Sequence, residues 1–194
     1  MRDDDWKTRL IKKLEPILRE QDPRPNISAY HDMPYAIFRY PPEDEFLVRQ
    51  ELTLLQTRLE QSGKQITVIS LAECLQSALD AEGMDIKTLA EAETSVGMEP
   101  TVETIHQIIS EYRPLDELVA ERIPPDVDPL LDIVFLVRAG ALFPIYRTSS
   151  LLEQLKGKVY VPAVLFYPGE MDGAAGLRFM GVLDAEHNYR PKIF

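Results

Sequence analysis

Two continuous apolar runs joined by a short amphipathic segment constrain the fold of this chain more than any other feature. The runs are residues 133–137 and 159–166, and both are rich in β-branched and aromatic residues. Strands that are covered on both faces of a parallel sheet have this composition. Between the runs, residues 148–156 place three leucines on one side of a predicted helix. Because strand, helix and strand in this order close most economically as a parallel crossover, we predict two parallel strands here.

The same order occurs earlier in the chain. Residues 35–40, which are apolar or aromatic except for Arg39, are predicted as a strand that Pro41 and Pro42 end. Residues 66–71 form a second run typical of a buried strand. The segment between them places apolar residues on one helical face up to about residue 61. Further amphipathic helices are predicted at residues 6–20, 72–81 and 101–112. Residues 84–100, in contrast, are acidic and show no strong pattern.

These elements predict a single α/β domain over residues 1–194. We expect three layers around a mainly parallel sheet, Rossmann-like or P-loop-like but without the phosphate loop. Near the C-terminal end, residues 177–183 alternate as a strand. Residues 189–194 are predicted to return beside them as an antiparallel hairpin at one edge of the sheet.

Acidic residues are concentrated in the first part of the chain. The net charge is −11, which divides into −13 for residues 1–137 and +2 for residues 138–194. This balance argues against binding through non-specific phosphate contacts, so no direct sequence-specific nucleic-acid binding is expected. It favours a protein partner with a basic patch. No run of 18 apolar residues and no apolar signal region are present, so we expect a cytoplasmic protein without a membrane span.

The motifs of common catalytic and cofactor sites are absent from the sequence. There is no GxxxxGK[ST] phosphate loop, no GxGxxG fingerprint and no GxSxG nucleophile elbow. The three histidines, His31, His106 and His187, fall in different predicted elements without metal-ligand spacing. We therefore expect no catalytic residue, no metal site and no cofactor.

The loops after the predicted strands at residues 133–137 and 159–166 hold the candidate binding residues, because ligands of open parallel sheets bind outside the carboxyl ends of the strands. Arg138 and Arg147 follow the first strand, and Thr148 or Ser149 is placed to cap the next helix and offer backbone N–H groups to an anion. A turn after the second strand would carry carboxylates. These two sets form either a binding site or a structural ion pair. The full set of partner- or anion-binding candidates is Arg138, Arg147, Thr148, Tyr167, Glu170, Asp172, Arg178 and Arg190.

The C-terminal third resembles the BrxB family, an accessory component of BREX bacteriophage-exclusion systems. The resemblance rests on four separated motifs in one order: FLVRAGALFPIYRTSSLLEQL, VPAVLFYPGEMDG, LRFMGVL and NYRPKIF. It implies a small non-enzymatic adaptor that contacts other BREX proteins, particularly a PglZ-type component with a phosphatase fold. Its oligomeric state is not implied. Two alternatives remain open at this point: a nucleotide- or phosphate-binding regulatory domain, and a degenerate enzyme with a metal bound by carboxylates such as Glu170.

One structural hypothesis concerns Arg147 in particular. This residue begins the predicted helix after one strand, and the turn at residues 167–172 ends the neighbouring strand. Both would lie at the same edge of a parallel sheet. We predict that Arg147 bridges this turn and holds the 177–183 strand against the sheet, since a guanidinium donates in a fixed fork.

Overall fold

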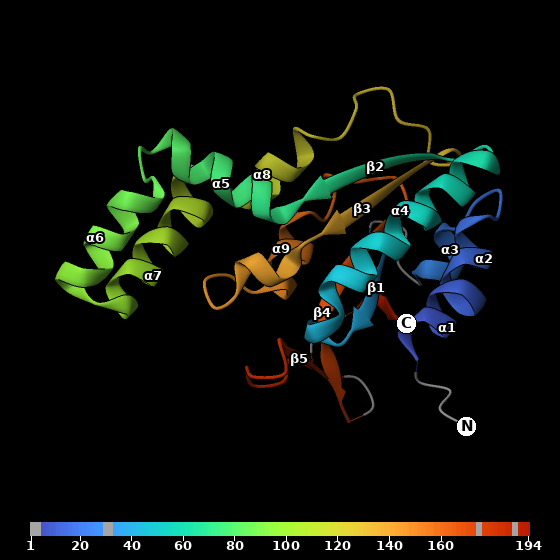
Figure 1. Cartoon of the computed structure of the whole chain (residues 1–194). Coiled ribbons are helices and arrows are strands. Elements are labelled where there is room, and N and C mark those ends of the chain that lie inside the picture. Colours follow the sequence, from blue (N-terminus) through green and yellow to red (C-terminus); the bar gives the residue numbers. More distant parts are fainter. Residues whose placement is uncertain (1–4, 29–32, 174–175, 188–189) are drawn as a thin grey trace.

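A computed structural model describes residues 5–28, 33–173, 176–187 and 190–194. A sheet with five parallel strands forms its centre, in the order β2-β3-β4-β1-β6, and β5 pairs antiparallel with the end of β4 (Figure 1). The strands are β1 (Tyr35–Tyr40), β2 (Gln65–Ser70), β3 (Asp132–Val137), β4 (Ala163–Asp172), β5 (Gly176–Phe179) and β6 (Lys192–Ile193). The predicted α/β class with a mainly parallel sheet is confirmed.

Helices cover both faces of the sheet. The helices are α1 (Trp6–Arg9), α2 (Glu15–Leu18), α3 (Arg24–Ile27), α4 (Glu45–Gln61), α5 (Leu71–Ala81), α6 (Ile86–Val96), α7 (Met98–Gln107), α8 (Leu115–Ala120) and α9 (Thr148–Gln154). A π-helical turn at Leu10–Leu14 joins α1 to α2, and another at Ile108–Tyr112 extends α7. Helices α1 to α4 pack on one face, whereas α5, α7, α8 and α9 pack on the other.

Alternation along the central strands builds two separate cores. In β1, Phe38 belongs to the core under α4, and Ile37 belongs to the core under α5 and α9. β4 divides in the same way between Phe166 and Leu165. Because side chains of a strand point alternately to the two faces, a strand covered on both faces must be apolar throughout. This is why the central strands are almost entirely apolar in the sequence, with Arg39 in β1 and Asp132 at the start of β3 as the exceptions.

A buried ion-pair network attaches the N-terminal helices to α4. Glu15 is only 5% exposed. Its carboxylate accepts hydrogen bonds from Arg58 Nη2 at 2.9 Å and from Arg19 Nη2 at 2.7 Å. Arg58 also reaches Glu51, which pairs with Lys7 at 3.0 Å. Burial alone would raise the pKa of Glu15, but the hydrogen bonds from Arg58 and Arg19 outweigh it and hold the pKa below its ordinary value.

Three details of the predicted fold are wrong. β2 was expected to be buried, but it forms an edge of the sheet and Val68 is 47% exposed. Residues 167–172, predicted as a turn, continue β4: Pro168 still pairs with β1, and residues 169–172 then pair with β5. The predicted hairpin partner of residues 177–183 is also wrong, because residues 192–193 form β6 and pair in parallel with β1.

Residues 84–100, which showed no strong pattern, form most of a helical arm. α6 and α7 run side by side and project away from the sheet (Figure 1). The Asp85 side chain caps α6 by accepting from Thr88 N at 2.7 Å. Gly97, with φ of 92°, makes the turn into α7. α7 is anchored to the body by Ile105 and by the π-helical turn that follows it.

Candidate functional site

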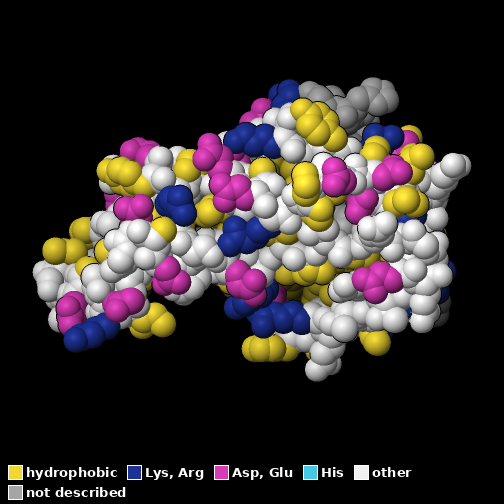
Figure 2. All heavy atoms as spheres, turned by 90° about the horizontal axis from the view of Figure 1, so that it is seen from above, with side chains coloured by type: hydrophobic (Ala, Val, Ile, Leu, Met, Phe, Trp, Pro, Cys, Tyr) yellow, Lys and Arg dark blue, Asp and Glu magenta, His cyan; other side chains and the backbone are white. Residues whose placement is uncertain are grey.

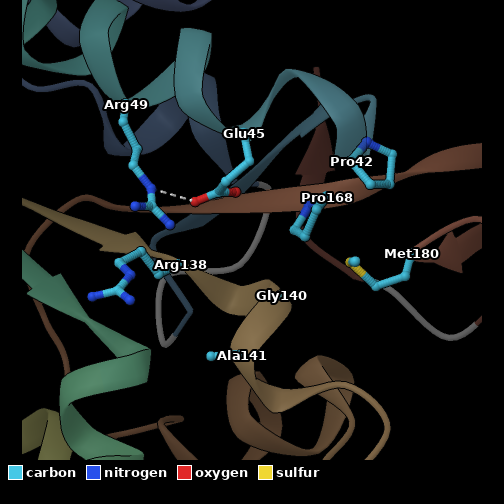
Figure 3. Close-up of a pocket in the computed structure, with 8 residues that line it drawn as sticks. All are labelled: Pro42, Glu45, Arg49, Arg138, Gly140, Ala141, Pro168 and Met180. Atoms are coloured by element: carbon cyan, nitrogen blue, oxygen red, sulfur yellow. Dashed lines mark hydrogen bonds and ion pairs between the residues drawn. The ribbon is translucent and has the colours of Figure 1, made fainter.

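A crevice lies at the carboxyl edge of the sheet, where the connections that leave β1 and β3, the two strands beside β4, diverge. After β1 the chain enters α4 on one face, whereas after β3 it leads to α9 on the other. Ligands of open α/β sheets bind at such a switch point. The crevice here has a volume of about 330 Å³ and is lined by Pro42, Glu45, Arg49, Arg138, Gly140, Ala141, Pro168 and Met180 (Figure 3).

Among the described residues that line this crevice, Glu45 is the one carboxylate, and it already has partners. Glu45 accepts a hydrogen bond from Arg49 Nε at 2.8 Å and a short one from the hydroxyl of Tyr40. Burial and this contact with Glu45 both raise the pKa of Tyr40, so the phenol stays protonated and donates. Arg49 also stacks over the ring of Phe46. Its Nη1 and Nη2 atoms form no ion pair with a described residue.

Arg138 is the second cation of the crevice and differs from Arg49 in having no partner. The residue is half-buried, and among the described residues none forms a hydrogen bond or ion pair with its guanidinium. In Figure 3 it lies on the same side of the crevice as Arg49, with Pro42, Pro168 and Met180 on the other. The crevice lining thus has two arginines against one carboxylate. Its polar side is cationic and its other side apolar.

The backbone of the crevice is strained at two points. Arg138 has φ of 59° and ψ of 38°, in the left-handed region, and Met180 has φ of 54°. They are the two non-glycine residues with positive φ in the described part of the chain, and both line the crevice. A side chain with a Cβ in this region costs about 1–2 kcal/mol. Such strain clusters at ligand sites because the surrounding structure must hold it in place.

Thr148 does not have the capping role predicted for it. The N-cap of α9 is Arg147, and no side chain caps the helix. Thr148 is 1% exposed, so its hydroxyl faces the protein interior. With seven residues, α9 is also too short to offer a strong anion site at its N-terminus.

Arg147 forms an ion pair, but not with the predicted residues. Its Nη1 lies 2.6 Å from Glu186 Oε1, and Glu186 in turn exchanges backbone hydrogen bonds with Leu177. The guanidinium therefore connects the start of α9 to the β5 region through Glu186, and the predicted bridge to residues 167–172 is wrong. The Arg147 side chain is 59% exposed. Water screens the pair, which reduces its contribution to about 0–1 kcal/mol.

The remaining predicted residues lie along β4 and β5 and are not gathered into one site. Tyr167 is fully buried and packs against Phe179. Glu170 is exposed and lies opposite Arg178 in the antiparallel pair. Arg178 is 3.5 Å from Asp172, with both side chains 44% exposed. The structural alternative, an ion pair of Arg138 or Arg147 with Glu170 or Asp172, is not formed among the described residues. Arg190 is exposed near β6.

Sequence reasoning found Arg138 but missed the other polar residues of the crevice. Glu45 and Arg49 were assigned only to an amphipathic helix. A signal was nevertheless present: an acid and a base four residues apart in the first turns of a helix that directly follows a buried strand. Met180 gave no signal, because nothing in its neighbours marks a positive φ. Within the described residues no group of three His, Cys, Asp or Glu could hold a metal ion, while His31 falls outside them.

The helical arm forms a second surface of functional interest. Residues 85–107 contain five acidic residues and one lysine, a net charge of −4. Three hydrophobic side chains on it are strongly exposed: Ile86 (78%), Met98 (64%) and Val96 (60%). A groove of about 320 Å³ runs between α6 and α7, with Leu89 and Val102 in its lining. Figure 2 shows the arm at the left, with hydrophobic side chains next to acidic ones.

None of the described helices is long and apolar enough to cross a membrane.

Comparison with known proteins assigns most of this chain to one family. A family model described as BREX protein BrxB matches residues 67–193. A curated protein of the same description from Bacillus cereus (strain H3081.97) is 29% identical over 182 residues, 93% of each chain. Another, from Escherichia coli O9:H4 (strain HS), is 25% identical over 150 residues, 76% of this chain and 72% of the other. No solved structure matches the chain significantly.

Proposed function

Since the chain belongs to the BrxB family of BREX phage-defence components, we propose that it acts there as a non-enzymatic adaptor whose α6–α7 arm docks onto another BREX protein. The observation that supports this most is the arm itself. It projects from the body of the protein and combines exposed apolar side chains with a charge of −4. The non-enzymatic part rests on the sequence, which lacks nucleophile, phosphate-loop and dinucleotide motifs.

The composition of the arm supports a protein partner. Exposed apolar side chains that gather on one element, surrounded by polar residues, are typical of protein interaction sites. In α6 no residue is buried, so the helix has little reason within this chain to keep Ile86 and Val96 apolar. Contact with a partner would remove them from water. The exposed apolar residues of α6 therefore favour an interface over a simple solvated helix.

The charge of the arm indicates the chemistry of the partner. Glu91, Glu93, Glu99 and Glu103 are spread over both helices, so a nucleic acid would be repelled. A surface with lysines or arginines around an apolar pocket would be attracted, and the association would be accelerated at low salt. The resemblance noted in the sequence makes the PglZ-type component the first partner to test.

The test compares variants that alter the arm without altering the core. In the double variant Ile86→Ser, Met98→Ser both changed side chains are exposed, so folding should be unaffected. Leu54→Ser is the matched control, because Leu54 is 54% exposed on α4, away from the arm. We expect the double variant to weaken binding of the purified PglZ-type component at least tenfold in surface plasmon resonance, with Leu54→Ser unchanged.

A second variant tests the charge. Glu91→Lys together with Glu93→Lys should lower the association rate more at low salt than at high salt. Binding that is equal for the parent, the apolar variant and the charge variant would refute the arm as the docking site. Loss of binding in Leu54→Ser alone would place the interface on α4 instead.

A further inference from the structure

We propose that the crevice at the carboxyl edge of the sheet binds a small phosphomonoester. The proposal is independent of the arm, because the two surfaces share no residue. It starts from the cationic side of the crevice. Arg138 has no partner among the described residues, and Arg49 uses only Nε in its pair with Glu45. The terminal nitrogens of both guanidinium groups therefore remain available to an anion.

An arginine that is half-buried and has no partner is unusual in a folded protein. Arginine remains charged at all relevant pH values, and burial of an uncompensated charge is unfavourable. Elsewhere in the described chain Arg19, Arg24, Arg58 and Arg178 all reach carboxylates. An anion in the crevice would give Arg138 the same kind of partner. A phosphomonoester has a charge near −2 and three acceptor oxygens, so one group can engage two guanidinium forks.

The strained backbone points to the same place. Arg138 keeps a left-handed conformation that glycine would adopt without cost, and Met180 does the same across the crevice. The conformation of Arg138 fixes the direction in which its side chain leaves the end of β3. A residue that is costly for the fold but places a cation at the edge of a crevice is expected where a ligand binds.

The apolar side of the crevice defines the rest of the ligand. Pro42, Pro168 and Met180 face the arginines across it (Figure 3). Gly140 lies beside them, and a Cβ there would be in ordinary van der Waals contact with the Met180 sulfur at 3.4 Å and with Pro168 Cγ at 3.6 Å. A volume of about 330 Å³ is at the small end of ligand pockets. The crevice therefore suits a sugar phosphate or a mononucleotide and is too small for a dinucleotide.

A second basic pocket provides an internal control. It has a volume of about 400 Å³ and includes Arg9, Lys13, Arg39 and Lys192. Arg9 already donates to the carbonyl of Arg39 and lies over the ring of Phe38, and Lys192 donates to Asn26. Arg9 and Lys192 thus already have partners within the chain, whereas Arg138 has none among the described residues, so we expect the ligand in the crevice. Lys13 is exposed, and its removal should not affect folding.

The test is isothermal titration calorimetry of the full chain with AMP, ribose 5-phosphate and adenosine. We expect AMP or ribose 5-phosphate to bind and adenosine to show no detectable binding at the same concentration. Arg138→Gly should weaken binding of the phosphate-bearing probe about tenfold to hundredfold, as expected for loss of hydrogen bonds to a charged group. Lys13→Gln should bind as the parent does. Far-ultraviolet circular dichroism and urea unfolding would show that both variants fold.

Each outcome decides between supporting and overturning the proposal. Binding of ribose 5-phosphate as tightly as AMP assigns the site to sugar phosphates, and preference for AMP assigns it to nucleotides. Absence of binding by both probes overturns the proposal, as does binding that Arg138→Gly leaves unchanged. Weakening by Lys13→Gln but not by Arg138→Gly also overturns it, because the anion would then occupy the other pocket. None of these results bears on partner binding through the arm.

Discussion

Replacing Arg138 by glycine and by alanine should separate the cost of its backbone conformation from the role of its side chain. Both variants remove the guanidinium, but only alanine keeps a Cβ in the left-handed region. The Cβ costs about 1–2 kcal/mol at this φ. Glycine loses about 0.5–1 kcal/mol more conformational entropy on folding than alanine does. The difference leaves Arg138→Gly more stable than Arg138→Ala by about 1 kcal/mol.

The opposite order is expected at an ordinary helical position, which supplies the control. Thr57 is exposed in the middle of α4, where alanine should be more stable than glycine by about 1 kcal/mol. Urea unfolding followed by circular dichroism measures all four variants under the same conditions. For a chain of this length, 1 kcal/mol corresponds to about 2–4 °C in Tm, so thermal unfolding provides a second measurement.

The result that would refute this reasoning is an alanine variant at position 138 that equals or exceeds the glycine variant in stability. The backbone there would then not be strained, and the case for a ligand-directed arginine would lose one of its two supports. If glycine is the more stable residue, Arg138 is less favourable for folding than the alternative. The presence of arginine would then have to be explained by what its guanidinium binds.

Three further predictions concern stability. Glu15→Gln should lower the free energy of unfolding in urea by about 2 kcal/mol, because Arg58 loses its charged acceptor. Since the pKa of Glu15 is lowered in the folded state, this contribution is complete above about pH 4.5 and is lost as the pH falls further. A deficit of the variant that persists at pH 2 would contradict the assignment. Gly169→Ala should cost about 1–3 kcal/mol in the same assay, because the new Cβ would lie 2.4 Å from the carbonyl oxygen of Arg178, and wild-type stability would show that the backbone yields there. Arg147→Ala should change stability by at most about 1 kcal/mol, and a larger loss would mean that its pair with Glu186 is less screened than its exposure indicates.

The sequence was sufficient to predict the central strands because their environment dictates their composition. β1, β3 and the first half of β4 are covered on both faces, and only almost entirely apolar runs suit that position. β2 had the same appearance in sequence yet lies at an edge. β2 is still rich in β-branched apolar residues, although Val68 faces water. The composition of a strand therefore does not show whether it lies at the edge or in the interior of the sheet.

The errors arose where tertiary contacts override local signals. Pro168-Gly169 is a strong turn signal, but β1 pairs with β4 as far as Pro168, and Gly169 allows the close approach of β5. Most of α7 lies in the predicted helix at residues 101–112, but α6 was missed because it buries no residue and depends on the Asp85 cap and the Gly97 turn. Of the predicted site residues, Arg138 lines the crevice, whereas Thr148 and Arg147 are directed elsewhere by the short α9.

The sheet order has a consequence for the synthesis of this protein. Strand β1 lies between β4 and β6, and both of its neighbours come from residues 163–194. Ala163 follows Tyr40 by 123 residues, which at about 5–20 residues per second is about 6–25 s of translation. During that time the most apolar strand of the N-terminal half has no partner to pair with. The nascent chain should therefore depend on chaperones until its last strands emerge, and fragments that end before residue 163 should aggregate rather than fold.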